Sequence, residues 1–464
     1  MARSRATQRR VAAATVIGTT IEWYDFFIYS TVAALVLAQQ YFAPAGESVA
    51  QLLSFVTVGI SFLFRPLGAL IAGHLGDRLG RRAILVMTLI MMGAATALIG
   101  LVPNYDSIGL AAPLALILLR ILQGMSAGGE WGGAVLMAVE HADPKRRGRA
   151  GAFPQLGVPL GMLLASGVMA LMTGVIAPGE AFQSWGWRVP FLLSIVLVFV
   201  GYAVRRSVEE SPVFRELEKV ADRPKLPIVT LFRKHGWLVL VAALVFAGNN
   251  AAGYMTTGGF VTRYATSSEV GLDATAVLLA VSAGSAIWLV STWFAGSLSD
   301  RIGRAHTYQI GFGLQILTSF PLFWLVSTGN LGALYLALGL FSLGLGLSYG
   351  PQAALYSELF PASIRFSGVS ISYALGAVLG GAFAPTIAQA LMQATGGTAA
   401  VSWYLIGMAV LSLAAVSLLR DRRGISLSPD AESLQSRGQW VFSPKEAAEN
   451  HTAQPAQESQ PAAR

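Results

Sequence analysis

The sequence predicts an all-α polytopic membrane protein, with twelve transmembrane helices in two six-helix bundles. The first observation is the composition: 54% of the residues are hydrophobic and only 12% are charged, about half the charged share of a soluble domain. The second is a repeat, since Gly73 to Arg82 and Gly296 to Ala305 share the pattern Gly-x-Leu-x-Asp-Arg-x-Gly-Arg. The copies lie almost half of the chain apart, which indicates duplication of a multi-helix unit.

Twelve apolar segments account for the predicted helices. Most reach the ~20 residues that a helix needs to cross ~30 Å of hydrocarbon. They occupy residues 11–37, 51–73, 83–103, 110–136, 150–176, 189–204, 236–261, 274–296, 306–327, 331–353, 366–392 and 400–419. The sixth is long enough only if Gln183 to Arg188 contributes to it. The first is not a cleaved signal peptide, because it is long and contains Glu22 and Asp25.

Basic residues gather in alternate gaps between these segments. The gaps on one side contain most of the Lys and Arg. The gaps on the other side have only Arg188, at the edge of its gap, and Arg263. Because basic loops stay in the cytoplasm, we expect both termini there, in a multi-pass protein of the cell (inner or plasma) membrane. The net charge of +8 is thus an orientation signal. The expected partner is the lipid bilayer and not nucleic acid.

The same pattern divides the chain into five parts. The six-helix bundles are expected at 11–204 and 236–420, joined by a polar, cytoplasmic central loop at 205–235. A cytoplasmic N-terminal tail covers 1–10. The C-terminal tail, 421–464, is rich in Ser, Pro, Gln, Glu and Ala, and we expect it to be disordered because it has few apolar residues to bury.

The residue inventory argues against an enzyme or a receptor. The chain has no Cys, which excludes disulfides, thiolate metal sites and Cys nucleophiles. The five His residues are not spaced as metal ligands. No Ser-His-Asp set, His cluster or acidic metal site is found near the predicted membrane faces. The C-terminal tail is too short and polar for an output domain. We therefore expect no metal and no cofactor.

Carboxylates inside the predicted helices are candidates for binding a proton, the expected coupling ion, as it crosses the membrane. A charge at mid-bilayer costs ~3 kcal/mol or more, so it marks a functional position. Glu22 and Asp25 are three residues apart on one face of the first helix, and Glu130 lies on the fourth. A buried carboxylate beside an Arg can exchange a proton near neutral pH, as coupling requires.

Other polar residues inside the helices are candidates for binding a solute. On the fourth helix Arg120, Gln123 and Glu130 form one polar stripe, and Arg120 could bind a carboxylate through both ends of its guanidinium. The alternative is static packing, either as ion pairs that include Arg65 or as polar contacts between helices. The candidates are Arg120, Gln123, Trp131, Asn249, Asn250, Tyr254 and Gln352.

The repeated loops are candidate gates. Their glycines allow tight turns and close helix approach, their aspartates can accept hydrogen bonds from a helix N-terminus, and their arginines can pair with acids of neighbouring helices. The assigned residues are Gly73, Asp77, Arg78, Gly80, Arg81, Gly296, Asp300, Arg301, Gly303 and Arg304. Because Ala305 stands where the first loop has Arg82, we expect the second gate to hold less tightly. The alternative is a basic turn that only sets orientation.

These loops resemble the signature of the major facilitator superfamily, and Arg120 to Gly124 resembles its second motif. Further strings resemble one branch, the metabolite:proton symporters. They are Ile21 to Phe27, Leu63 to Gly68, Gly128 to Gly133, Ser184 to Phe191, Glu209 to Phe214 and Glu358 to Pro361. The resemblance implies the major facilitator fold and import of shikimate, dicarboxylates and other organic acids, or of proline and betaine. The string Gly128 to Gly133 is closer to the shikimate side.

The chain is thus predicted to be a secondary transporter that imports a small polar metabolite with protons, by alternating access of two bundles. An organic acid, shikimate-like or a dicarboxylate, is the first expectation, and proline or betaine is the alternative. An exporter of the same fold fits less well. Exporters usually carry Gly-x-x-x-Gly-Pro-x-x-Gly-Gly in the fifth helix, which Gly157 to Gly161 matches poorly. We expect a monomer.

Overall fold

The computed structural model describes residues 5–71, 81–128, 130–140, 142–206, 227–257 and 259–442. Within these ranges eleven helical spans are long and apolar enough to cross a membrane. A shorter apolar helix, Met87–Leu101, lies at the place of the third predicted segment. The prediction of an all-α membrane protein is confirmed.

The N-terminal half follows the predicted order of spans. η5 adds a turn before α11, so the sixth span is lengthened as the sequence required. The elements are α1 (Arg5–Val32), η1 (Ala33–Leu37), α2 (Ala38–Tyr41), η2 (Ala43–Ala45), α3 (Glu47–Leu63), α5 (Arg81–Leu101), α6 (Tyr105–Ile108), α7 (Ala111–Ala127), α8 (Glu130–Glu140), η3 (Pro144–Arg146), α9 (Arg147–Leu171), η4 (Met172–Ile176), α10 (Glu180–Ser184), η5 (Gly186–Arg188) and α11 (Val189–Arg206).

The C-terminal half contains the other six spans. Two of these spans are broken, since α18 continues the path of α17 and α20 continues that of α19. The elements are α13 (Pro227–Thr257), α14 (Phe260–Ala265), α15 (Ala274–Ile302), α16 (Arg304–Ser327), α17 (Leu331–Leu347), α18 (Gln352–Leu359), α19 (Arg365–Gly380), α20 (Ala384–Thr395), α21 (Ala399–Ser417), η6 (Pro429–Ala431) and α22 (Glu432–Gln435).

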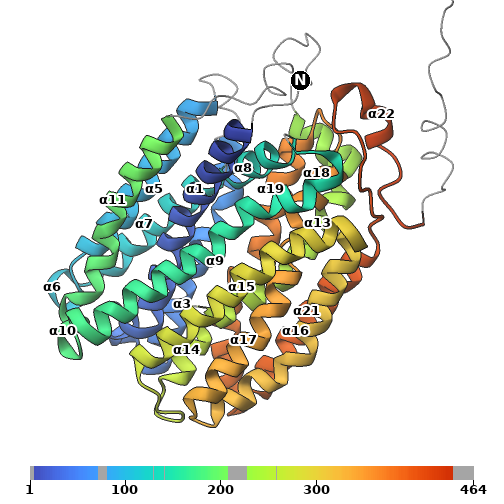
Figure 1. The fold of residues 1–464 in the computed structure, drawn as a ribbon. Coiled ribbons are helices and arrows are strands. Elements are labelled where there is room, and N and C mark those ends of the chain that lie inside the picture. Colours follow the sequence, from blue (N-terminus) through green and yellow to red (C-terminus); the bar gives the residue numbers. More distant parts are fainter. Residues whose placement is uncertain are drawn as a thin grey trace, which may run out of the picture.

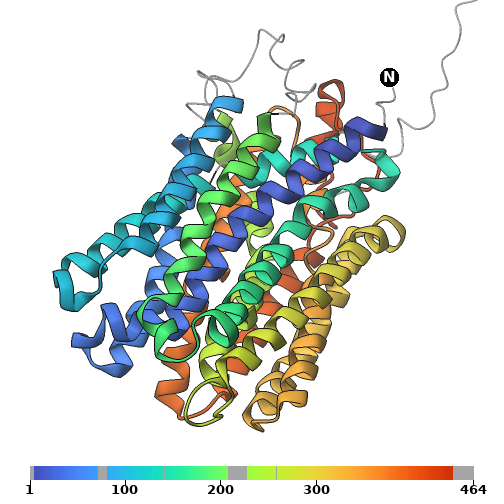
Figure 2. The ribbon, with the colours of Figure 1, turned by 60° about the vertical axis from the view of Figure 1, so that its left-hand side comes forward.

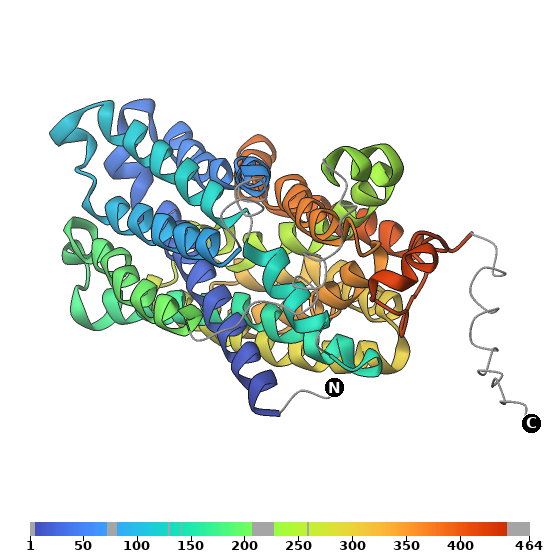
Figure 3. The same ribbon diagram turned by 90° about the horizontal axis from the view of Figure 1, so that it is seen from above.

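The two halves form two bundles that lie side by side (Figures 1 and 3). In the N-terminal bundle α1 packs against α9 and α11, and α5 packs against α7 and α11. In the C-terminal bundle α13 packs against α19 and α21, and α16 against α17 and α21. The contact of α9 with α15 joins the bundles.

One end of the molecule carries the basic residues that bridge the bundles, and we name it the basic end. Figure 1 shows α8, α18 and α22 at this end and α6 and α10 at the opposite end. Figure 2 shows that α1 also begins there. The sequence pattern predicts that the basic end faces the cytoplasm.

The surface exposes many large apolar side chains, and the interior holds buried charged and polar residues as well as an apolar core, as expected for a protein whose solvent is lipid. Leu317, Phe199 and Trp324 have exposed fractions of 72%, 70% and 70%. By contrast Arg120 is 0% exposed and Asp25 1%. Charges that the sequence placed inside the helices are therefore held within the protein and kept from the hydrocarbon.

Two predicted boundaries need correction. The central loop does not reach residue 235, because α13 begins at Pro227 and continues through a kink at His235 (φ −129°, ψ 18°). The C-terminal tail is not disordered from residue 421. Residues 421–442, which we name the C-terminal strap, contain η6, α22 and a bridge from Leu419 to Trp440. The strap is ordered although it has few apolar residues to bury, because polar residues of the bundles bind it, as described below.

Candidate functional site

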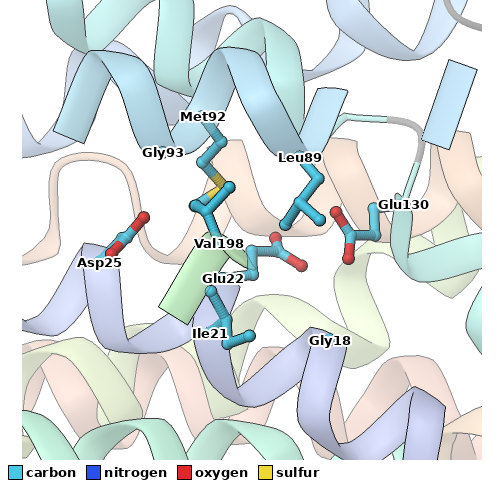
Figure 4. A pocket seen from close by; sticks show the side chains of 9 residues that line it. All are labelled: Gly18, Ile21, Glu22, Asp25, Leu89, Met92, Gly93, Glu130 and Val198. Atoms are coloured by element: carbon cyan, nitrogen blue, oxygen red, sulfur yellow. The ribbon is translucent and has the colours of Figure 1, made fainter. Parts of the chain in front are cut away.

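Three carboxylates of the N-terminal bundle line one narrow pocket, and they are the residues that the sequence singled out for proton binding. Glu22 and Asp25 come from α1 and Glu130 begins α8; Figure 4 shows them with the apolar side chains that complete the wall. In this view the Glu22 and Glu130 carboxylates point toward one another. The pocket is a narrow space between packed side chains, and Glu22 and Asp25 are 3% and 1% exposed, so these carboxylates lie in a closed environment.

Asp25 is held entirely within the N-terminal bundle by the hydrogen bonds of its carboxylate. Thr96 of α5 donates to Oδ2 at 2.8 Å, and Ser194 of α11 donates to Oδ1 at 2.6 Å. Two hydroxyl donors therefore replace water around a carboxylate that is 1% exposed. Sequence reasoning missed both hydroxyls, because Ser and Thr are common in membrane helices and only packing brings them to Asp25.

Arg120 of α7 is likewise bound within the N-terminal bundle. Its Nη1 donates to Gln123 Oε1 at 2.7 Å, and Gln123 Nε2 donates in turn to Thr96 Oγ1 at 2.6 Å. The remaining contacts reach α3, where Nε donates to the Thr57 carbonyl at 3.2 Å and Nη2 to Ser61 Oγ at 2.7 Å. Arg120 and Gln123 thus lie together as predicted, but their hydrogen bonds connect α7 to α3 and α5.

Arg120 also lies over the rings of Phe26 and Tyr29, at 5.1 and 4.0 Å, and Arg65 shares such aromatic contacts but differs in its polar ones. Arg65 follows α3, is 1% exposed, and its Nη2 lies 3.8 Å from Glu22 Oε1. The guanidinium faces the rings of Phe26 and Phe62, each 4.4 Å from its central carbon. Cation–π contacts and one long ion pair therefore surround this buried cation.

An aromatic cluster connects the two bundles beside Arg65. Trp131 of α8 stacks on Tyr373 of α19 with ring centroids 3.7 Å apart, and Tyr373 stacks on Phe246 of α13 at 4.5 Å. Trp131 Nε1 donates to Gln155 of α9 at 3.0 Å, and Gln155 Nε2 lies 3.3 Å from Gln352 Oε1 of α18. The predicted candidates Trp131 and Gln352 are thus brought together at the boundary between the bundles.

The asparagines of α13 lie elsewhere and bind neighbouring helices of their own bundle. Asn249 Nδ2 donates to the Leu345 carbonyl at 3.0 Å and to Ser348 Oγ at 2.6 Å. Asn250 Nδ2 donates to the Ala377 carbonyl at 3.1 Å. These contacts correspond to the alternative of polar contacts between helices. The side chain of Tyr254 lies outside the described residues.

The second repeated loop connects the bundles at the basic end. Asp300, at the end of α15, accepts hydrogen bonds from the backbone N–H groups of Gly148 and Arg149 at 2.8 and 2.9 Å. A carboxylate thus caps the N-terminus of α9, where the helix dipole favours negative charge. Arg304 donates to Asp300 Oδ1 at 2.6 Å and to both oxygens of Glu358 at 3.2 Å.

The glycines of this loop are required by geometry. A Cβ on Gly296 would lie 2.7 Å from the Gly148 carbonyl oxygen of α9. Gly303 has φ +112°, a conformation that favours glycine, and a Cβ there would lie 2.2 Å from Asp421 Oδ2. The Arg301 side chain is exposed, and its carbonyl accepts a hydrogen bond from Arg423 at 2.8 Å.

The first repeated loop cannot be compared with the second in the same way. Gly73, Asp77, Arg78 and Gly80 lie outside the described residues, as does the side chain of Arg81. The expectation that the second gate is the weaker one therefore stays a prediction.

The C-terminal strap lies across the basic end and binds both bundles. Arg147 of α9 donates to the Ile425 carbonyl at 2.5 Å. Arg365 of α19 donates to the Leu427 carbonyl at 2.9 Å and to Gln435 Oε1 at 2.9 Å, and its Nη1 also pairs with Glu140 of α8 at 3.3 Å. From the sequence these arginines counted only among the basic residues that set orientation, because their partners are distant in the chain.

The strap is also held by its own arginine. Arg422 donates to the carbonyls of Leu434, Gln435 and Arg437 at 2.7 to 2.9 Å and to that of Glu358 at 3.2 Å. Burial lowers the pKa of Arg422 to about 10, so it remains a cation at neutral pH. Backbone carbonyls thus replace the water that this guanidinium loses.

Comparison with known proteins identifies the family. The chain matches the family model of the Major Facilitator Superfamily over residues 15–385. It belongs to the major facilitator superfamily. Among solved structures of this fold, the superfamily's proton:xylose symporter XylE bound to 6-bromo-6-deoxy-D-glucose superposes with a TM-score of 0.74. That match covers 93% of this chain and 100% of XylE at 18% identity.

Relatives of the chain within the superfamily are metabolite transporters by name. The chain is 41% identical to the inner membrane metabolite transport protein YhjE of Escherichia coli, with 91% of this chain and 96% of that protein covered. It is 35% identical to the shikimate transporter of E. coli (90% and 96% covered). It is 32% identical to a putative proline/betaine transporter of Staphylococcus aureus (95% of both chains covered). The protein is therefore a multi-pass membrane transporter of small metabolites and not an enzyme.

Proposed function

We propose that this transporter imports a small organic acid together with protons, by alternating access of its two bundles. The observation that carries the proposal is the pocket lined by Glu22, Asp25 and Glu130. Three carboxylates inside one membrane-embedded bundle are costly unless they exchange protons or pair with cations. A solute acid is favoured because the relatives include the shikimate transporter of E. coli.

Alternating access is supported by the contacts at both ends of the bundles. At the basic end α9 meets α18, and its first residues meet Asp300 of α15, whose contact with α9 and η4 continues along the helix to Ser282 and Thr275. At the opposite end α20 meets α3, and α14 meets η1. In this arrangement the bundles enclose the boundary between them from both sides. Import then requires the two sets of contacts to open in turn.

The test is uptake by proteoliposomes under an imposed pH gradient, with shikimate, succinate, proline and glycine betaine as separate solutes. We expect accumulation of an acid when the interior is alkaline, and loss of that accumulation when a protonophore collapses the gradient. Accumulation of betaine or proline alone would favour the osmolyte carrier suggested by the S. aureus relative. Gradient-driven efflux without accumulation would indicate an exporter, and transport that ignores the gradient would contradict proton coupling.

A further inference from the structure

Arg65 and Arg120 are equally buried, yet their donors are used differently. Arg120 donates hydrogen bonds through Nε, Nη1 and Nη2 within its own bundle. The Nε and Nη2 atoms of Arg65 have no hydrogen-bond acceptor among the described residues. A buried donor without an acceptor costs free energy. The two unpaired donors of Arg65 therefore suggest a ligand, whereas the donors of Arg120 are already bound.

Aromatic faces hold Arg65 in place without using its N–H groups. Its central carbon lies 4.4 Å from the ring centroids of Phe26 and Phe62 and 5.3 Å from that of Trp23. Such contacts stabilise the positive charge through the face of the guanidinium and leave its edge available. The acid at that edge, Glu22, stands 3.8 Å from Nη2, farther than a hydrogen bond.

The C-terminal bundle brings further buried polar groups to the same place. Tyr373 of α19 interacts electrostatically with Arg65, Glu22 and Tyr349. The hydroxyls of Tyr373 and Tyr349 and the indole N–H of Trp288 are buried, and none makes a hydrogen bond of normal geometry within the described part of the chain. The rings form one cluster, with Trp288 and Tyr349 centroids 6.0 Å apart. Polar groups from both bundles therefore converge, and the contacts of Tyr373 with Arg65 and Tyr349 fall short of hydrogen bonds of normal geometry.

We infer that Arg65 binds the carboxylate of the transported solute, with the Tyr373 hydroxyl of the opposite bundle as a second contact. The planar guanidinium matches a carboxylate with two parallel hydrogen bonds. A solute held by both residues spans the boundary between the bundles, which is where alternating access needs it. The stacked rings of Trp131 and Tyr373 separate when the bundles move apart, since they belong to different bundles.

This inference rests on the proposed function but is independent of which solute is transported, because shikimate, succinate, proline and betaine all carry a carboxylate. The test is equilibrium binding to the full chain in lipid nanodiscs without any gradient. The ligands are the best-binding acid of that panel and its methyl ester. We expect the wild type to bind the acid at least about tenfold more tightly than the ester, because a charge-assisted hydrogen bond contributes about that factor in affinity.

Arg65→Gln is expected to reduce this preference to near onefold, and Arg65→Lys to an intermediate value. The matched control is Arg120→Gln, which removes an equally buried arginine and should lower the melting temperature while keeping the preference for the acid. Tyr373→Phe, nearly isosteric, should weaken binding of the acid severalfold with an unchanged melting temperature. If Arg65→Gln fails to fold, the binding affinity of Tyr373→Phe still tests the inference.

The inference is overturned if Arg65→Gln keeps the preference, if Arg120→Gln abolishes it, or if Tyr373→Phe leaves affinity for the acid unchanged. It is also overturned if the wild type does not distinguish acid from ester or binds no acid of the panel. Failure of the proposed function would be seen differently, as wild-type proteoliposomes that bind a solute without gradient-driven accumulation.

Discussion

At the scale of the residue, the two acids of α1 have different neighbours although they are one turn apart. The hydrogen-bond partners of Asp25, Thr96 and Ser194, belong to its own bundle. Glu22 faces Arg65 and interacts electrostatically with Tyr349 and Tyr373 of the C-terminal bundle. In the proposed alternating access the bundles move relative to one another, so we expect the surroundings of Glu22 to change more than those of Asp25.

We therefore predict that Glu22→Gln abolishes accumulation under a pH gradient. The side chain at position 22 changes its neighbours between the two conformations of the proposed cycle, and an amide there cannot bind and release a proton. Exchange of labelled for unlabelled solute without a gradient should continue. Asp25→Asn should retain part of the accumulation and lower the melting temperature, since it weakens hydrogen bonds to two helices. Proteoliposome uptake and counterflow measure both. The reverse pattern, with coupling lost only in Asp25→Asn, would assign the proton to Asp25.

At the scale of the element, the contact between α9 and α15 depends on glycine at the point of closest approach. A Cβ on Gly148 would lie 2.3 Å from Ser299 Oγ, 2.4 Å from Arg304 Nη1 and 2.5 Å from the Gly296 carbonyl oxygen. Small residues allow helix backbones to approach closely in membranes, where no hydrophobic effect drives their association. The same approach brings Asp300 to the N-terminus of α9.

Gly148→Ala is predicted to separate α9 from α15 and weaken the closed basic end. The control is Gly167→Ala on the same helix, where a Cβ would meet nothing within 4 Å. Because the chain has no cysteine, Ala353→Cys introduces a single thiol at a position that is 0% exposed and borders Gly151 of α9. A water-soluble maleimide should label it severalfold faster with Gly148→Ala and at an unchanged rate with Gly167→Ala. Equal rates in both would contradict the prediction.

At the scale of the whole molecule, the strap joins the two bundles, which move relative to one another in the proposed alternating access. It binds Arg147 of the N-terminal bundle and Arg365 of the C-terminal bundle. Gln435 is 1% exposed and accepts hydrogen bonds from Ala362 N–H at 2.8 Å and Arg365 Nη2 at 2.9 Å. The basic end cannot open fully while all these contacts persist, so the strap stabilises the closed arrangement.

Removal of residues 421–464 is predicted to increase labelling of Ala353→Cys severalfold, because the strap no longer connects the bundles. The matched control removes only 443–464 and keeps the strap, and it should label at the wild-type rate. Measuring solute counterflow in the same samples separates a change in gating from loss of fold. Unchanged labelling after removal of 421–464 would show that the strap has no effect on the closed state.

The sequence by itself determined the class and the repeat. Low charge, long apolar segments and a loop copied at half the chain length specify a two-bundle membrane protein, because lipid allows only helices here and their lengths follow the bilayer. It also singled out Glu22, Asp25 and Glu130, since a charge within an apolar segment is visible without a structure.

Only the tertiary structure decided how those charges are used. In the sequence Arg65 and Arg120 are alike, and both lie against aromatic rings in the structure, but packing gives hydrogen-bond acceptors to Nε and Nη2 of Arg120 and none to those of Arg65 among the described residues. The same holds for the tail, whose polar composition predicted disorder while Arg147 and Arg365 supply its partners. The physical reason is that composition and periodicity report burial, whereas hydrogen bonds and ion pairs depend on which distant residues the fold brings within bonding distance of one another.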